Sequence, residues 1–154
     1  MLMADPGAAL RETRRVLRDG SPLAFAVWST PERNPWAAIP GMTLVQRGHV
    51  PPPEPGAPGA FALGMPERLR GLVSEAGFPD PEIEELQFAF HYADDDDVWD
   101  ALVSLAGSLA RVVNAMPDDE RKATRAAILE NVSTYRNNDG SYSTPASTWG
   151  VFTR

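Results

Sequence analysis

The sequence contains no cysteine and only two histidines, His49 and His91. Without cysteine there are no disulfides, thiol nucleophiles, zinc fingers or iron–sulfur clusters. Two histidines that lie far apart in the chain also do not suggest a histidine-rich metal site. We therefore expect no bound metal.

Basic residues are also scarce, since 14 Lys and Arg stand against 21 Asp and Glu and give a formal net charge of −7. Nucleic acids and anionic membranes bind basic surfaces, so we expect neither as a partner. The densest basic group, at positions 11, 14, 15 and 18, is interleaved with Glu12 and Asp19, which is typical of a solvated helix face.

Long apolar runs are absent too. No stretch approaches the roughly 20 residues that span a bilayer. The first residues, Met-Leu-Met-Ala-Asp-Pro, have neither the basic start nor the apolar core of a signal peptide. We therefore expect a cytoplasmic protein.

The sequence has 154 residues, of which 43% are hydrophobic. This is enough to bury a sizeable core, and we expect a single domain over residues 1–154. Residues 49–65 are rich in proline and glycine, which disrupt helices and sheet ladders. They predict a flexible loop.

Local patterns predict helices that alternate with strands. Asp5 can cap a helix that ends before Gly20, and the apolar run Leu23–Trp28 predicts a strand buried on both faces. Residues Glu82–Tyr92 alternate as in a half-buried strand, and 147–153 predict a last strand. Helical spacing is found in four further segments: 34–45 as one or two short helices, 66–76 closed by a glycine turn at Gly77, 98–112 and 124–135.

The order helix, glycine turn, strand in residues 5–25 carries a specific pattern. It reads D-P-x-x-x-L-x-E-x-x-R-V-L, followed by Gly20 and by the strand that begins at Leu23. This pattern resembles the stretch after the fourth strand of class I S-adenosylmethionine-dependent methyltransferases, in the ubiquinone/menaquinone-biosynthesis-like (methyltransferase type 11) group. Members usually have Pro-Gly-Gly at the turn, where this chain has Arg-Asp-Gly-Ser.

The resemblance implies an α/β fold, the C-terminal half of a Rossmann-like methyltransferase fold. Its small mixed three-stranded sheet would place 147–153 antiparallel between 23–28 and 86–92. The helices of 98–135 would form a lid over an acceptor pocket.

The family binds S-adenosylmethionine through a glycine-rich turn after its first strand and an acidic residue after its second. This chain contains no Gly-x-Gly and matches only the half that follows those elements. We assign no cofactor-binding residue and no catalytic residue, and we do not expect the chain alone to bind S-adenosylmethionine.

Aromatic residues suggest where a small-molecule acceptor would bind. Trp36 follows the strand 23–28, and ligands of α/β proteins bind at the carboxyl ends of strands. The alternative is that these large side chains are simply core residues. The predicted acceptor-binding residues are Trp28, Asn34, Trp36, Phe88 and Trp99.

Two further groups have a structural and a chemical interpretation. His91 could act as a general base beside Tyr92, but its place on the polar face of a strand favours an ordinary surface histidine. The four aspartates 94–97 could bind a cation, but their position directly before a helix favours capping.

We therefore predict a methyltransferase-like protein that supplies the acceptor-binding half and is inactive alone. The partner would be a chain that supplies the N-terminal half, or a second copy that covers the open edge of the strand 23–28. The alternative is a non-catalytic module, which binds a small molecule or forms a homodimer.

Overall fold

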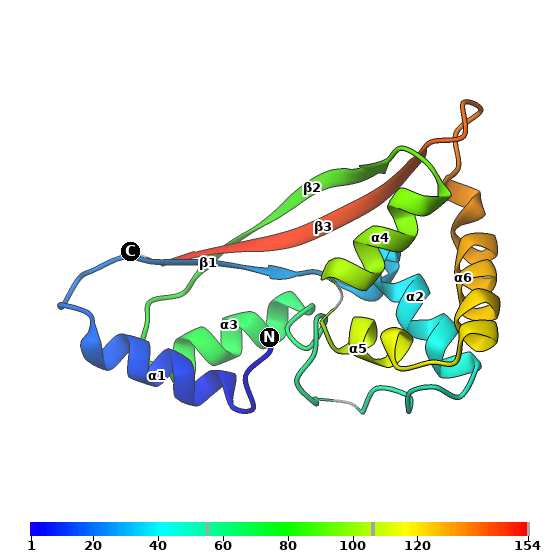
Figure 1. Ribbon diagram of the computed structural model, residues 1–154. Helices are drawn as coiled ribbons and strands as arrows, with labels where there is room; N and C mark the ends of the chain where they lie inside the picture. Colours follow the sequence, from blue (N-terminus) through cyan, green and yellow to red (C-terminus); the bar gives the residue numbers. More distant parts are fainter. Residues whose placement is uncertain (55, 106, 154) are drawn as a thin grey trace. The chain divides into compact units, whose positions relative to one another are not determined.

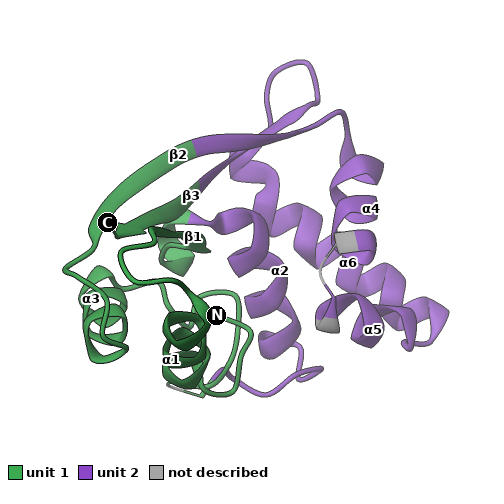
Figure 2. Cartoon of the chain, turned by 90° about the vertical axis from the view of Figure 1, so that its left-hand side faces the viewer, with its two compact units in different colours: residues 1–33, 54–87, 147–154 green, residues 34–53, 88–146 purple. Residues whose placement is uncertain are grey.

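The computed structural model describes residues 1–54, 56–105 and 107–153 (Figure 1). The chain divides into two compact units, each built from separate stretches of sequence (Figure 2). Unit 1 comprises residues 1–33, 54–87 and 147–154, and unit 2 comprises 34–53 and 88–146.

A three-stranded sheet is built from β1 (Leu23–Trp28), β2 (Glu82–Tyr92) and β3 (Tyr142–Thr153). The order is β1-β3-β2, so the last strand is the central one, as the sequence predicts. β3 runs antiparallel to β1, with Leu23 opposite Thr153. It also runs antiparallel to β2 (Figure 1). The sheet is thus antiparallel at both pairings rather than mixed, because β3 separates the two strands that share a direction.

Two helices of unit 1, α1 (Pro6–Val16) and α3 (Pro66–Glu75), cover one face of the sheet. The side chain of Asp5 caps α1 by accepting a hydrogen bond from the Ala8 amide at 2.8 Å, as predicted. After α3, Gly77 adopts a φ of 86°. The Phe78 amide then donates to the Val73 carbonyl at 3.3 Å, which is the predicted Schellman ending.

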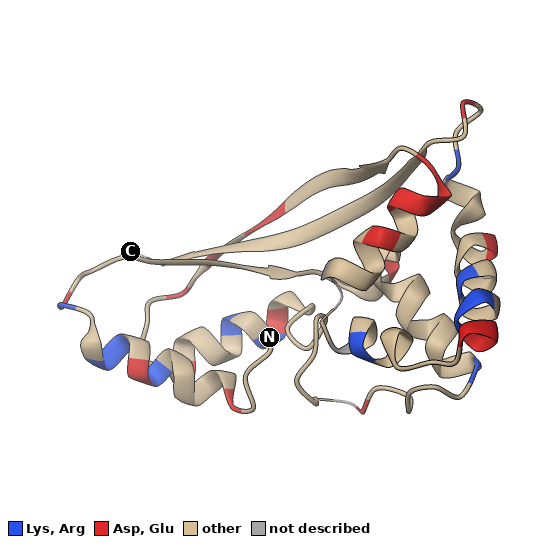
Figure 3. Cartoon of the chain, in the orientation of Figure 1, with Lys and Arg blue, Asp and Glu red and all other residues tan. Residues whose placement is uncertain are grey.

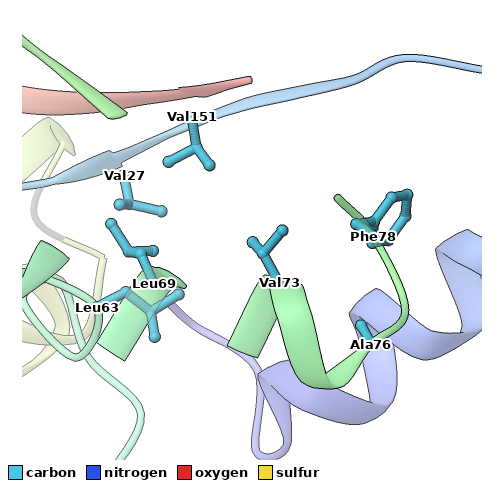
Figure 4. Packing of buried hydrophobic residues seen from close by; sticks show 7 residues of the cluster. All are labelled: Val27, Leu63, Leu69, Val73, Ala76, Phe78 and Val151. Carbon is cyan, nitrogen blue, oxygen red and sulfur yellow. The ribbon is translucent and has the colours of Figure 1, made fainter. Parts of the chain in front are cut away.

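The core of unit 1 lies between these helices and the sheet. Leu63 anchors the end of the proline-rich segment in this core, with 4% of its surface exposed. The buried residues of the cluster are Val27, Leu63, Leu69, Val73, Ala76, Phe78 and Val151 (Figure 4).

The prediction that β1 is buried on both faces is wrong. Phe25 and Val27 pack toward the core, but Ala24 and Ala26 are exposed. Leu10 of α1 and Leu69 of α3 pack in the cluster that contains Val27, so both helices cover the same face. The opposite face of β1 is apolar and exposed.

Unit 2 is mainly helical and contains α2 (Pro35–Gln46), α4 (Asp95–Leu105), α5 (Ser108–Asn114) and α6 (Asp118–Val132). Short 3₁₀ turns lie at Pro31–Arg33 (η1, in unit 1) and Ser133–Tyr135 (η2). α2 is one helix with Pro40 inside it. The Asn131 amide nitrogen of α6 donates to the Thr43 hydroxyl of α2 at 2.9 Å and joins these helices.

The helix predicted over 98–112 is two helices in the structure. Gly107 lies between α4 and α5 with a φ of 51°, a backbone conformation that ends a helix. The buried residues of unit 2 form two small clusters, Leu44 with Val113 and Met116, and Val98 with Val132 and Tyr142.

β3 begins at Tyr142 rather than at 147, and this extension passes through the exposed Pro145, which obscured it in the sequence. Of the loop predicted over 49–65, the described residues from 51 on form no helix or strand. Its flexibility and the single-domain organisation stay predictions. No helix in the described ranges is long and apolar enough to cross a membrane.

Candidate functional site

The start of α2 holds two of the predicted acceptor-binding residues in contact. Asn34 occupies the N-cap position before Pro35 and is fully buried. Its side-chain oxygen accepts a hydrogen bond from the Trp36 indole nitrogen at 3.1 Å. This bond fixes the indole ring, because Trp nitrogen is only a donor and the amide oxygen is held inside the protein.

Trp36 contacts Phe90 of β2, and Phe90 in turn contacts Phe88. The Trp36 ring centroid lies 5.0 Å from that of Phe90, with a tilt of 57°. Phe90 lies 5.6 Å from Phe88 in an edge-to-face arrangement at 72°. These are the distances and angles of attractive aromatic pairs. We call Asn34, Trp36, Phe88 and Phe90 the aromatic cluster.

The aromatic cluster combines an accessible ring with a buried amide. Phe88 is 44% exposed, so one ring is available to a ligand. The exposed ring offers flat apolar contact, which suits a small planar molecule. Phe90 is not among the predicted acceptor-binding residues, although its alternation with Phe88 along β2 places both rings on one face.

Trp28 and Trp99 are the other two predicted acceptor-binding residues. Trp99 packs against the core cluster of Leu44, Val113 and Met116. Trp28 is the last residue of β1 in unit 1, lies opposite Thr148 and is half-buried. The structure thus brings Asn34, Trp36 and Phe88 together, and a binding role for each of the five stays a prediction.

His49 takes part in a polar cluster that joins the end of α2 to the first turn of α6. Its Nε2 lies 2.8 Å from Glu120 Oε1, and Arg47 Nη2 donates to the same oxygen at 2.5 Å. The Arg47 Nε also lies 3.2 Å from the Thr124 hydroxyl. The hydrogen bonds from Arg47 and then His49 lower the pKa of Glu120. All four residues therefore connect helices.

A second polar group, in unit 1, could not be foreseen from the sequence. Glu85 of β2 forms an ion pair with Arg33 and accepts a hydrogen bond from the Ser147 hydroxyl at 2.7 Å. The bond from Ser147, followed by contacts with Gln87 and Arg33, lowers the pKa of Glu85. Residues so far apart in the chain form no recognisable motif.

Asp94 and Asp97, from the run of four aspartates 94–97, cap the start of α4, as the sequence favours. Asp94 Oδ1 accepts from the amides of Asp96 and Asp97 at 3.0 Å each, and Asp97 Oδ2 accepts from the Ala93 amide at 2.9 Å. Negative charge gathers in the first turns of α4 and α6, where the helix dipole favours it (Figure 3). His91 is an exposed residue of β2, as its position on the polar face predicts.

The described residues do not form a metal site. No group of three or more His, Cys, Asp or Glu side chains there could hold a metal ion. S-adenosylmethionine needs a glycine turn between a strand and the following helix. The segments that follow β1 and β2 into helices, 29–34 and 93–94, contain no glycine. The described residues therefore do not fit this cofactor.

One glycine does allow a close backbone approach at the end of β1, but protein atoms already fill the space. A Cβ on Gly64 would lie 2.9 Å from the Ser29 carbonyl oxygen. The Gly64 carbonyl in turn accepts from the Trp149 indole at 2.7 Å. Gly64 therefore serves packing within unit 1.

A shallow depression of about 460 Å³ lies on the surface of α3 in unit 1. It includes none of the predicted acceptor-binding residues. An ion pair of Arg70 with Asp80 at 2.7 Å occupies part of its wall. The lining residues are Pro66, Glu67, Arg70, Gly71, Ser74 and Asp80.

Comparison with known proteins gave one kind of match. No family model matches the sequence, and no curated protein matches it. Among solved structures, the chain is similar to a candidate methyltransferase from Bacillus halodurans, with 17% sequence identity and a TM-score of 0.48. The match covers 99% of this chain and 63% of that one, so this chain spans less than two thirds of that structure's length.

Proposed function

We propose that this chain is the acceptor-binding portion of a methyltransferase-like protein and that it catalyses no methyl transfer by itself. The observation that carries the proposal is the position of β3, antiparallel between β1 and β2. This is the strand order that the pattern in residues 5–25 implies. That pattern itself folds as α1, a turn at Gly20 and β1.

The aromatic cluster is the acceptor-binding surface in this proposal. Its rings offer stacking and edge contacts, and the hydrogen bond from Trp36 to the buried Asn34 amide holds the indole ring in place. The acceptor class that suits such a surface is a small, planar and largely apolar molecule, such as a phenol or a fused aromatic ring.

A second candidate is a non-catalytic binding module. The observation that favours it is the lack of glycine in the described strand-to-helix segments. In this candidate the aromatic cluster still binds a planar ligand, but no methyl transfer follows.

The cofactor part of the proposal is tested by calorimetric titration of the purified chain with S-adenosylmethionine. We expect no binding at micromolar concentrations and no methylated product when planar phenols are added. Methyl transfer by the pure chain would contradict the proposal. Recovery of activity after addition of a separate cofactor-binding chain would distinguish the first candidate from the second.

The acceptor part is tested with 2-naphthol as a planar probe. Because Phe88 is 44% exposed, Phe88→Ala should leave the fold intact. We expect the affinity for 2-naphthol to fall about 2–10-fold with the loss of one aromatic contact. Leu86→Ala is the matched control, since Leu86 is a similarly exposed residue of the same strand (48%).

Two results would count against this role of the aromatic cluster. One is equal affinity of Phe88→Ala and the unchanged chain. The other is an equal loss in Phe88→Ala and Leu86→Ala. An NMR shift of the Trp36 indole N–H on addition of 2-naphthol gives a second, independent readout.

A further inference from the structure

The outer edge of β1 presents unpaired backbone groups. The Ser29 amide donates to the Ser147 carbonyl at 3.0 Å, which makes these residues a hydrogen-bonded pair of the antiparallel ladder. Such pairs recur at every second residue, so Phe25 and Val27 also bond to β3. The N–H and C=O groups of Ala24 and Ala26 therefore point away from the sheet.

This edge lacks three of the devices that protect strand edges, namely charge, proline and a bulge. The sequence Leu-Ala-Phe-Ala-Val-Trp has no charged residue and no proline, and its register with β3 is continuous. Ala24 and Ala26 are small and exposed, so an approaching strand meets no bulky side chain there.

The other edge of the same sheet is protected. β2 lies at that edge and carries Glu82, Glu84 and Glu85 in unit 1. A second copy at this edge would bring like charges together, which opposes pairing. In unit 1 the two edges thus differ, because the β2 edge carries three glutamates and β1 carries no charged residue.

We propose that β1 pairs antiparallel with β1 of a second copy, so that two sheets become one continuous sheet across a two-fold axis. Ala24 lies opposite Ala26 of the partner subunit, and Ala26 lies opposite Ala24 of the partner subunit. This register is self-complementary, because each of these residues offers one N–H and one C=O and receives one of each.

Charges at the two ends of β1 support a second copy as the occupant. Asp19 before the strand pairs with Arg14, and Arg33 after it pairs with Glu85. Two other charged residues next to the ends of β1 are Arg18 and Glu32. Both are exposed, and neither forms an ion pair within the described part of the chain. Antiparallel pairing brings the start of one β1 close to the end of the other, so Arg18 faces Glu32 of the partner subunit.

The experiment is sedimentation velocity of the full chain from low micromolar to submillimolar concentration. We expect a species of twice the chain mass of 16.7 kDa. Ala26→Pro removes the N–H that points outward and leaves the ladder to β3 intact. We expect its dimer dissociation constant to rise about tenfold or more, since two symmetric hydrogen bonds are lost.

Ala26→Val is the matched control, because it keeps the N–H and favours a strand. Exchanging the two charges gives a second test that changes no residue of the sheet. Arg18→Glu should weaken the dimer, and adding Glu32→Arg should restore it. A chain that stays monomeric throughout the concentration range overturns the proposal, and the edge then awaits a different chain. A dimer that Ala26→Pro leaves unchanged overturns it as well.

Discussion

The close packing between the end of β1 and the segment before α3 leaves no room for a Cβ atom at Gly64. A Cβ at Gly64 would lie 2.9 Å from the Ser29 carbonyl oxygen and 3.1 Å from its carbon. Both are backbone atoms, which cannot move aside as a flexible side chain can. Gly64→Ala should therefore destabilise the protein by about 1–3 kcal/mol through overpacking.

Urea unfolding followed by fluorescence measures this change, and Gly71→Ala is the control. Gly71 lies inside α3, where an added Cβ meets nothing within 4 Å. This variant should be more stable by about 0.5–1 kcal/mol, because alanine favours a helix. Equal effects of the two substitutions would show that the approach to Ser29 is not tight.

The single residue Glu120 makes the free energy of unfolding depend on pH. Its pKa is lowered from 4.5 by Arg47 and His49, so the folded state favours the carboxylate. The stabilisation is present above pH 4.5 and is lost as pH falls through the lowered pKa. The urea midpoint of Glu120→Gln should lie below that of the unchanged chain near neutral pH, and the gap should narrow in acid.

Unfolding both proteins at a series of pH values tests this. Glu130→Gln is the control, because Glu130 lies on the same helix and its side chain forms no ion pair in the described structure. A gap that stays constant down to strongly acid pH would mean that Glu120 is not stabilised by its charge.

At the scale of one element, α4 depends on its first residues. Asp94 accepts hydrogen bonds from two amides that have no partner within the helix. Asp94→Ala should cost about 0.5–2 kcal/mol of unfolding free energy, whereas Asp94→Asn should change it little, because asparagine caps well. Thermal unfolding compares the two, and equal losses would mean that the cap contributes through its charge alone.

Elements were predictable where the signal is local. The cap at Asp5, the turn at Gly77 and the strand Leu23–Trp28 depend on a few adjacent residues, and the structure contains each. The break at Gly107 and the start of β3 at Tyr142 were not foreseen, since one glycine in a helical pattern and one proline in a strand are ambiguous.

In the candidate site, too, only contacts between residues close in sequence could be predicted. Asn34 and Trp36 are close in sequence, and a hydrogen bond joins their side chains. Phe90 could have been predicted from the sequence, because it alternates with Phe88 along the strand. The ion pair of Arg33 with Glu85 depends on the register between strands, which no local pattern encodes.

At the scale of the whole molecule, the two units interrupt each other in sequence. Unit 1 is assembled from three stretches of chain and unit 2 from two, and β2 and β3 each have residues in both. A unit of separate stretches cannot close its core while the connecting chain is unfolded without a large entropic cost. We therefore expect one cooperative unfolding transition, in keeping with the predicted single domain.

Single-tryptophan variants make this testable. Trp149 reports on unit 1, where its indole donates to the Gly64 carbonyl, and Trp99 reports on the core of unit 2. Variants that keep one of these and replace the other tryptophans with phenylalanine should unfold in urea together with the far-UV signal of the same protein, as two-state folding requires. If Trp99 instead responds at a lower urea concentration than the far-UV signal, unit 2 opens first, and the aromatic cluster belongs to the less stable part of the chain.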